Sequence, residues 1–383
     1  MVIQIINLSP LDVFKKYSSE YKIFRDVYSL GFFGLEIRAI TPALASLVQK
    51  IVLSEKEICY RRIKNNQIDL LVTGNLSSFK EISRKIVSHG DEDLGYRIVN
   101  VIKNFEEYGL QSYRIGNKQL SFSTPLIMGI LNVTPDSFSD GGKYVDRDFA
   151  LAHAIKMCED GADIIDIGGE STRPGADPVS LEEEIDRTIP VIKSIKKEIP
   201  DVLISIDTTK SEVANKALES GVSFVNDISA LTFDKNMLSI VKKYDAGLIL
   251  MHIKGIPKNM QDQPDYDDLI GEIYDFLYNQ SVAAGKKGLN KIIVDPGIGF
   301  GKTVEHNFEI LKRLGDFKSL GYPIMIGLSR KSFIGKILDL KIDERDIPTA
   351  ILESLAIQNS ARIIRTHNVK LAFQSGKILK NFI

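Results

Sequence analysis

Eight short apolar runs between residue 126 and the end of the chain alternate with longer segments that have the apolar spacing of helices. This alternation is typical of βα units that build a parallel sheet. Eight strands with eight following helices is the count of a (β/α)8 TIM barrel, and we predict this α/β fold. An open doubly wound sheet is the alternative, although it usually has fewer strands and needs a switch point in the strand order.

The expected strands are short and separated by one helix each. They span 126–131, 163–167, 203–206, 224–225, 248–251, 292–294, 324–326 and 362–364. The expected helices span 147–160, 181–198, 210–220, 235–244, 267–285, 303–314, 348–360 and 368–381.

The chain has 383 residues, which leaves room for a smaller domain ahead of a barrel of about 250 residues. Residues 1–108 mix strand-like and helix-like runs, so we predict a small α/β domain there, of unknown role. We assign residues 109–383 to the barrel domain. Its first part, 109–123, has the pattern of a hairpin that turns at Gly116 and Asn117, and we expect this hairpin to close the N-terminal end of the barrel.

Composition excludes several classes of function. The net charge is −1 and no long basic run occurs, so nothing indicates nucleic-acid binding. Two cysteines without paired spacing argue against a disulfide framework or a cysteine-based zinc site. No apolar run reaches 18 residues, so we expect no membrane contact and a cytoplasmic protein.

Polar and charged side chains follow every expected strand. The carboxyl ends of barrel strands lie on one face, where the active sites of such barrels are found. The sequence therefore predicts an active site built from all eight ends. These ends hold Asn132 with Asp136 and Asp140, then 168–175, Asp207 with Thr208, Asn226 with Asp227, His252, 295–302, 329–332 and 365–368.

The charges at these ends indicate two parts of a ligand. Cationic side chains suit a phosphate-type anion, because guanidinium groups match its oxygens. Acceptors suit a ligand edge that is rich in N–H donors. The sequence therefore predicts a substrate with an anionic tail and a nitrogen heterocycle. The cationic candidates are Arg173, Lys331, Arg365 and His367, and the acceptors are Asp207, Asn226 and Asp295.

Other motifs carry less weight. Residues 299–303 look like the end of a P-loop, but Pro296 stands where that motif needs glycine, so we reject a nucleotide-hydrolysing function. His252 has two equally good interpretations, a site residue or a hydrogen-bonded support. We expect His89, His153 and His306 to be surface or packing residues. No HxxxH or CxxC spacing occurs, so any metal is expected to be held weakly and through the substrate, as Mg²⁺ usually is.

These motifs resemble those of dihydropteroate synthase, a pterin-binding enzyme of folate biosynthesis. Residues 129–142 look like its first signature and residues 168–175 like its second. Further similarities lie at 206–208, 226–227, 295–302, 329–332 and 365–367, so the resemblance covers about 112–383. It implies a transferase that condenses 6-hydroxymethyl-7,8-dihydropterin pyrophosphate with 4-aminobenzoate, releases pyrophosphate and is a sulfonamide target.

The resemblance also implies a role for each site residue. The expected pterin ligands are Asp207, Asn226, Asp295 and Lys331. The expected pyrophosphate ligands are Asn132, Thr172, Arg173, Arg365 and His367, and Asn132 is also expected to bind Mg²⁺. The 4-aminobenzoate site is expected to contain Phe138, Pro174, Lys331 and Ser332. The residues expected to act in catalysis are Asp140, Lys331, Arg365 and His367, and the family further implies a homodimer.

Two residues depart from the family pattern. Asn368 stands where the family usually has Asp, and Lys254 stands where Arg is common. Residues 1–108 look similar to an extension of some bacterial and archaeal members. The alternatives are a methyltransferase that acts between a reduced folate and a corrinoid, an archaeal synthase that uses a ribosylated aminobenzene phosphate, and a non-catalytic pterin-binding protein.

Overall fold

The computed structural model describes residues 1–23, 33–55, 57–64, 66–133, 143–171 and 175–382, with the backbone alone at 143–146. These residues form two compact units, which are Met1–Tyr108 with Gly315–Gly321 and Gly109–Leu314 with Tyr322–Ile383. The grouping of 315–321 with the N-terminal residues was not expected from the sequence.

The second unit is a TIM barrel, as predicted. Its described strands pair in parallel in the order β12-β11-β10-β9-β8-β7-β14-β13, and a parallel bridge between Val294 and Ile324 joins the two ends of this order. The strands are β7 (Leu126–Asn132), β8 (Ile164–Gly168), β9 (Leu203–Asp207), β10 (Phe224–Asp227), β11 (Gly247–Met251), β12 (Ile292–Asp295), β13 (Met325–Ile326) and β14 (Ile363–Thr366).

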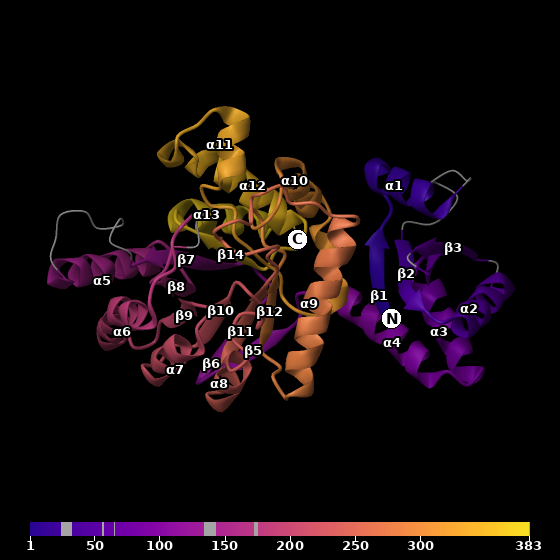
Figure 1. The fold of residues 1–383 in the computed structure, drawn as a ribbon, viewed down its shortest axis with the longest axis horizontal. Coiled ribbons are helices and arrows are strands. Elements are labelled where there is room, and N and C mark those ends of the chain that lie inside the picture. Colours follow the sequence, from indigo (N-terminus) through magenta and orange to yellow (C-terminus); the bar gives the residue numbers. More distant parts are fainter. Residues whose placement is uncertain (24–32, 56, 65, 134–142, 172–174, 383) are drawn as a thin grey trace. The chain divides into compact units, whose positions relative to one another are not determined.

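Helices surround these strands at the expected places, and Figure 1 shows α5 to α9 outside the barrel. The expected helices are α5 (Lys143–Glu159), α6 (Leu181–Glu198), α7 (Ser211–Glu219), α8 (Met237–Lys243), α9 (Leu269–Lys286), α10 (Val304–Lys312), α12 (Asp346–Gln358) and α13 (Val369–Leu379). The short α11 (Ser332–Leu338) and the 3-10 helix η4 (Ile342–Glu344) lie between β13 and α12 and were not expected. None of the helices in the described ranges is long and apolar enough to span a membrane.

A hairpin covers the N-terminal end of the barrel. Its strands are β5 (Ser112–Ile115) and β6 (Lys118–Ser121), and Phe122 follows them, fully buried. Phe122 packs in one apolar cluster with the first inward-facing residues of the barrel strands. The Tyr113 hydroxyl donates to the Ile292 carbonyl at 2.5 Å. Because this end is filled, the opposite end is the one available for a ligand.

The first unit is an antiparallel sheet with helices on both faces. Its strand order is β1-β2-β4-β3, and α2, α3 and α4 pack on one face in a continuous apolar core. The helix α1 packs on the other face. The elements are β1 (Val2–Asn7), α1 (Leu11–Tyr21), β2 (Phe33–Ile40), α2 (Pro42–Ser54), β3 (Ile58–Lys64), β4 (Gln67–Gly74), α3 (Leu76–Ser88) and α4 (Glu92–Glu106).

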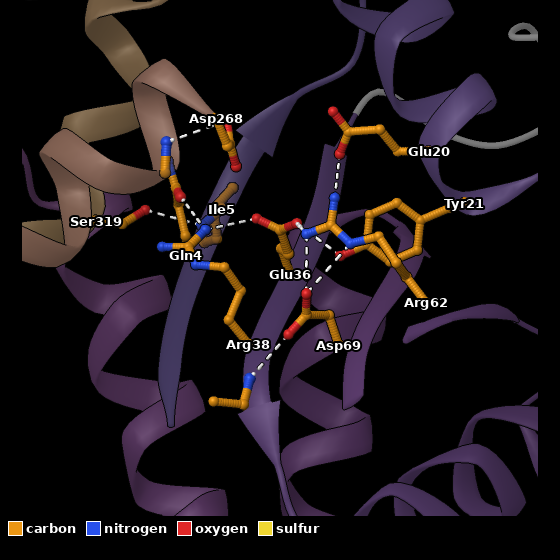
Figure 2. A network of polar contacts seen from close by, with 12 residues as sticks. Gln4, Ile5, Glu20, Tyr21, Glu36, Arg38, Arg62, Asp69, Asp268 and Ser319 are labelled. Atoms are coloured by element: carbon orange, nitrogen blue, oxygen red, sulfur yellow. Dashed lines mark hydrogen bonds and ion pairs between the residues drawn. The ribbon is translucent and has the colours of Figure 1, made fainter. Parts of the chain in front are cut away.

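Arg62 forms the centre of a polar network on the α1 face of this sheet (Figure 2). Its guanidinium contacts Glu20 of α1, Asp69 of β4 at 2.9 Å and Glu36 of β2 at 3.4 Å. The same group lies 4.5 Å from the centre of the Tyr21 ring. One cation therefore links α1 to three strands, which explains why buried carboxylates are tolerated there.

Residues 315–321 cover the free edge of β1. The Ser319 hydroxyl oxygen accepts a hydrogen bond from the Ile5 amide at 3.0 Å, and the Asp316 carboxylate accepts one from the Asn7 amide at 3.2 Å. These residues lie mostly in the 3-10 helix η3 (Leu314–Leu320). Satisfied edge amides do not pair with another chain, so this segment protects the β1 edge of the sheet from association.

Candidate active site

The predicted acceptors meet in one cavity at the carboxyl end of the barrel. Asp207, Asn226 and Asp295 end or nearly end β9, β10 and β12, and all three side chains are buried. The parallel register places Asn226 beside Asp207, so both reach the same face. The cavity is lined by Asp207, Asn226, Ile228, Met251, Asp295, Ile298, Phe300, Met325, Gly327, Lys331 and Arg365.

Arg365 spans this cavity between two carboxylates. Its Nε donates to Asp166 Oδ2 at 2.6 Å, and its Nη2 donates to Asp207 Oδ2 at 2.7 Å. Asn226 also donates to Asp166, at 3.0 Å. Asp166 was missed in the sequence analysis because it lies inside β8 rather than after it. The available signal was a charged residue within the otherwise apolar run Ile164–Ile167.

Burial makes the carboxylates of this cavity weak acids. It raises the pKa of Asp207 to about 7, and Arg365 opposes the rise. Burial also raises the pKa of Asp295 to about 6. The Gly297 amide, which donates to Asp295 Oδ1 at 2.7 Å, and the charge of Lys331 both oppose this rise. A ligand that donates N–H groups to these oxygens would favour their ionised form.

Lys331 enters the cavity from the loop after β13. Its ammonium lies 4.1 Å from the centre of the Phe300 ring, and burial lowers its pKa to about 8. Gly299 leaves space for the lysine chain, because a Cβ there would lie 3.2 Å from Lys331 Cδ. Gly299 also has φ +79°, which other residues rarely adopt. Ser332, the next residue along, lines a neighbouring groove with Gln261 and Lys336.

The remaining predicted residues fall into two groups. His367 follows β14, and both its backbone amide and its Nδ1 lie within hydrogen-bond distance of Ser329 Oγ, at 3.1 and 2.9 Å. Asn132 ends β7. Gly168 lies between Asn132 and Asp207: a Cβ atom added to Gly168 would be 3.6 Å from Asn132 Oδ1 and 3.6 Å from Asp207 Cβ. The residues outside the described ranges are Phe138, Asp140, Thr172, Arg173 and Pro174.

The structure favours the supporting interpretation of His252. Its Nδ1 lies 3.0 Å from the ammonium of Lys302, which is buried and also donates to the Phe300 carbonyl at 3.0 Å. Burial lowers the pKa of His252 well below its usual value, so the neutral ring can accept from Lys302. Lys302 thus holds the loop that carries Phe300 and was not singled out from the sequence.

His306 and Lys254 have local structural contacts. His306 forms a capping box with Thr303 at the start of α10. Lys254 lies 4.0 Å from the centre of the Tyr266 ring and pairs with Glu272 at 3.4 Å. Neither residue lines the cavity.

Comparison with known proteins identifies the family. A family model described as pterin binding enzyme matches residues 128–367. The chain belongs to this family. The match covers the barrel, including Asn132, Asp207, Asp295 and Lys331, and confirms the predicted resemblance.

Similar proteins of this family are dihydropteroate synthases. The Synechocystis enzyme is 49% identical over 255 residues, which cover 66% of this chain and 88% of that protein. A structure of the Yersinia pestis enzyme with a sulfonamide drug complex has a TM-score of 0.68 and 40% identity and covers 71% of this chain and 99% of that one. The Xanthomonas albilineans enzyme in complex with 7,8-dihydropteroate has a TM-score of 0.64 and 33% identity, with coverages of 71% and 98%.

Proposed function

We propose that this protein is a transferase of folate biosynthesis that joins 6-hydroxymethyl-7,8-dihydropterin pyrophosphate to 4-aminobenzoate, giving 7,8-dihydropteroate and pyrophosphate. The observation that carries the proposal is the single cavity in which Asp207, Asn226 and Asp295 face Lys331 and Arg365. The dihydropteroate complex of the Xanthomonas relative supports it.

The acceptors of the cavity suit the pterin ring. A pterin presents an amino group and ring N–H donors on one side, and Asp295 and Asp207 can each accept from them. The side-chain oxygen Oδ1 of Asn226 is buried and has no hydrogen-bond partner among the described residues, so it offers a further acceptor. The Lys331 ammonium can donate to the acceptor side of the ring.

The reaction exchanges one bond for another at the methylene carbon of the pterin. The C–O bond to pyrophosphate breaks, and its electron pair leaves with the pyrophosphate. The aminobenzoate nitrogen forms the new C–N bond and loses one proton. The transition state is loose and cation-like, so the buried carboxylates stabilise the pterin while cationic groups stabilise the leaving group. We assign the first role to Asp207 and Asp295, with Asp140, and the second to Arg365 and His367, with Thr172 and Arg173.

Arg365 connects pterin binding to pyrophosphate binding. Its Nη2 donates to Asp207 Oδ2 at 2.7 Å. A pterin N–H that takes over this carboxylate would release Nη2 for the pyrophosphate. The guanidinium is suited to this role because it binds two oxygens at once.

We further propose that Mg²⁺ binds at Asn132. Among the described residues no group of three or more His, Cys, Asp or Glu side chains could hold a metal. Mg²⁺ is usually bound by few protein oxygens together with substrate phosphate oxygens and water, so the single amide oxygen of Asn132 is a suitable protein ligand. Gly168 leaves space beside Asn132 Oδ1. When bound, the ion would neutralise pyrophosphate charge.

The site of the second substrate is proposed where Lys331 of the cavity meets Ser332 of the neighbouring groove. We propose that 4-aminobenzoate contacts Lys331 and Ser332, together with Phe138 and Pro174. Sulfonamides are proposed to compete for the same place, a proposal supported by the sulfonamide complex of the Yersinia relative.

A homodimer is proposed through the outer face of α12. Ile347, Ile351 and Leu355 recur every four residues on this helix and are 70%, 59% and 49% exposed. Exposed Ile337 and Ile342 lie on the preceding elements α11 and η4. A row of exposed apolar side chains on one helix face is typical of a protein interface.

The test of the proposed function is an assay with the purified full chain. Pterin pyrophosphate, 4-aminobenzoate and Mg²⁺ should together give pyrophosphate and dihydropteroate, and omission of any of them should stop the reaction. A methyl-transferring relative would instead consume a methylated folate and release no pyrophosphate. No product with the complete mixture would refute the proposal.

A further inference from the structure

Asp346, the first residue of α12, binds side chains from two neighbouring site loops. Arg330 Nε donates to its Oδ1 at 2.7 Å, and Arg330 Nη2 donates to its Oδ2 at 2.9 Å. Asn368 Nδ2 also donates to Oδ2, at 3.0 Å. One carboxylate therefore accepts three hydrogen bonds, two of them from a guanidinium in the strong bidentate arrangement.

Arg330 is held at its backbone as well as at its side chain. Its amide donates to Thr349 Oγ1 at 3.2 Å, and its carbonyl accepts from Arg345 Nη1 at 3.1 Å. Its φ is +56°, in the left-handed region that costs energy for a residue with a side chain. Lys331 follows directly, so the direction in which Lys331 leaves the chain depends on this arrangement.

Asn368 belongs to the turn that carries His367. Its own Oδ1 accepts from the Leu371 amide at 3.2 Å and caps α13. Ser329 joins the same two loops a second time, since its hydroxyl lies 2.9 Å from His367 Nδ1. The loop of Lys331 and the turn of His367 are thus linked by Ser329 on one side and by Asp346 on the other.

The residue types at positions 346 and 368 complement one another. A carboxylate at position 368 could not donate to Asp346 and would repel it. The amide of Asn368 both caps the helix and donates. Arg330 holds the pKa of Asp346 below its usual value, so Asp346 is charged at neutral pH.

We infer that Asp346 is a positioning residue that holds the Lys331 loop against the His367 turn, with Asn368 as its amide partner. In this chain the carboxylate that binds Arg330 lies on α12. The inference rests on the proposed function only for the roles of Lys331 and His367.

The test compares Asp346→Asn, Asn368→Asp and the double variant D346N/N368D with the unchanged full chain. Asp346→Asn should lower kcat/KM about 10- to 100-fold, because a displacement of about 1 Å has this effect at an active site. Asn368→Asp should also lower it, because two carboxylates would then face each other. The double variant again places an amide opposite a carboxylate, but the amide introduced at position 346 offers Arg330 one acceptor oxygen instead of two. Its loss of kcat/KM should therefore be smaller than the product of the two single losses.

Asp201→Asn is the matched control, since Asp201 is exposed in the loop between α6 and β9, at the amino end of the barrel strands, and the same change of side chain should leave kcat/KM unaltered. Hydrogen exchange of the backbone amides of 329–331 and 366–368, measured without substrate, gives a readout independent of turnover. Asp346→Asn should speed exchange in both segments, and the double variant should slow it again. Unaltered exchange in Asp346→Asn, or a double variant in which the two single losses of kcat/KM simply multiply, would overturn the inference. If the unchanged chain has no turnover, the proposed function is refuted, and hydrogen exchange alone then tests whether Asp346 positions the two loops.

Discussion

At the scale of single residues, burial in the cavity disfavours the charged forms of Asp207, Asp295 and Lys331. The guanidinium of the partly buried Arg365 compensates the two buried carboxylates of Asp166 and Asp207. Such a group of charges contributes little net stability when it is intact. Removal of one partner nevertheless destabilises the fold strongly, because the remaining charges stay buried without compensation.

Arg365→Ala is expected to abolish turnover and to lower the free energy of unfolding by about 3–5 kcal/mol at pH 8. Without Arg365 the pKa of Asp207 should rise further above that of an unfolded chain. A carboxyl whose folded pKa is raised stabilises the fold only while it is protonated. The loss should therefore be smaller at pH 5.5, which urea unfolding at both pH values will measure. Equal losses at the two pH values would contradict this electrostatic account.

The pH dependence of kcat/KM should be bell-shaped. Activity should fall as the pH drops through about 6 to 7, where Asp295 and Asp207 take up protons, and as it rises through about 8, where Lys331 loses its proton. Lys331→Arg keeps its charge at high pH and should remove the basic limb from whatever activity it retains. A basic limb that persists near pH 8 in this variant would show that another group titrates there.

At the scale of elements, the predicted strands were found because each apolar run ends in polar residues. The shorter elements escaped prediction. The helix α11 has seven residues, too few for its apolar spacing to stand out. The association of 315–321 with β1 depends on Ser319 and Ile5, which are 314 residues apart in the chain, and no local pattern reports such a contact.

The candidate site was predictable where residues follow strands and not where they lie within them. Asp207, Asn226, Asp295, Lys331 and Arg365 come together as the barrel topology requires. Asp166 was missed because its strand position suggested core packing. The supporting role of His252 was one of two equal interpretations from the sequence, which could not decide between them because its partner Lys302 is 50 residues away in the chain.

The hairpin at the closed end of the barrel should matter for stability but not for the chemistry. Phe122→Ala should lower the free energy of unfolding by about 3–5 kcal/mol, because it leaves a cavity in the cluster that fills the barrel end. The KM values should stay unchanged, since the site lies at the other end of the strands. Urea unfolding and steady-state kinetics will test both statements. A loss below about 1 kcal/mol would mean that the hairpin does not fill this end.

At the scale of the whole molecule, the exposed row on α12 leads to a prediction about assembly. Ile351→Glu places a charge at the centre of this row and should convert the proposed dimer into a monomer in sedimentation velocity experiments. Lys370→Glu, on α13, is a control for a charge change elsewhere. A dimer that persists in Ile351→Glu would place the interface elsewhere, and a monomeric unchanged chain would refute the dimer.

We propose that one cavity joins a pterin to an aromatic amine while pyrophosphate leaves. The most direct measurement is mass spectrometry of the product formed from isotope-labelled 4-aminobenzoate, with pyrophosphate determined in the same samples. We predict that labelled 7,8-dihydropteroate and pyrophosphate form in equal amounts. In Asp295→Asn the rate of formation of both should be at most about one hundredth of the rate of the unchanged chain. Pyrophosphate without labelled product, or labelled product that is unaffected by Asp295→Asn, would contradict the account.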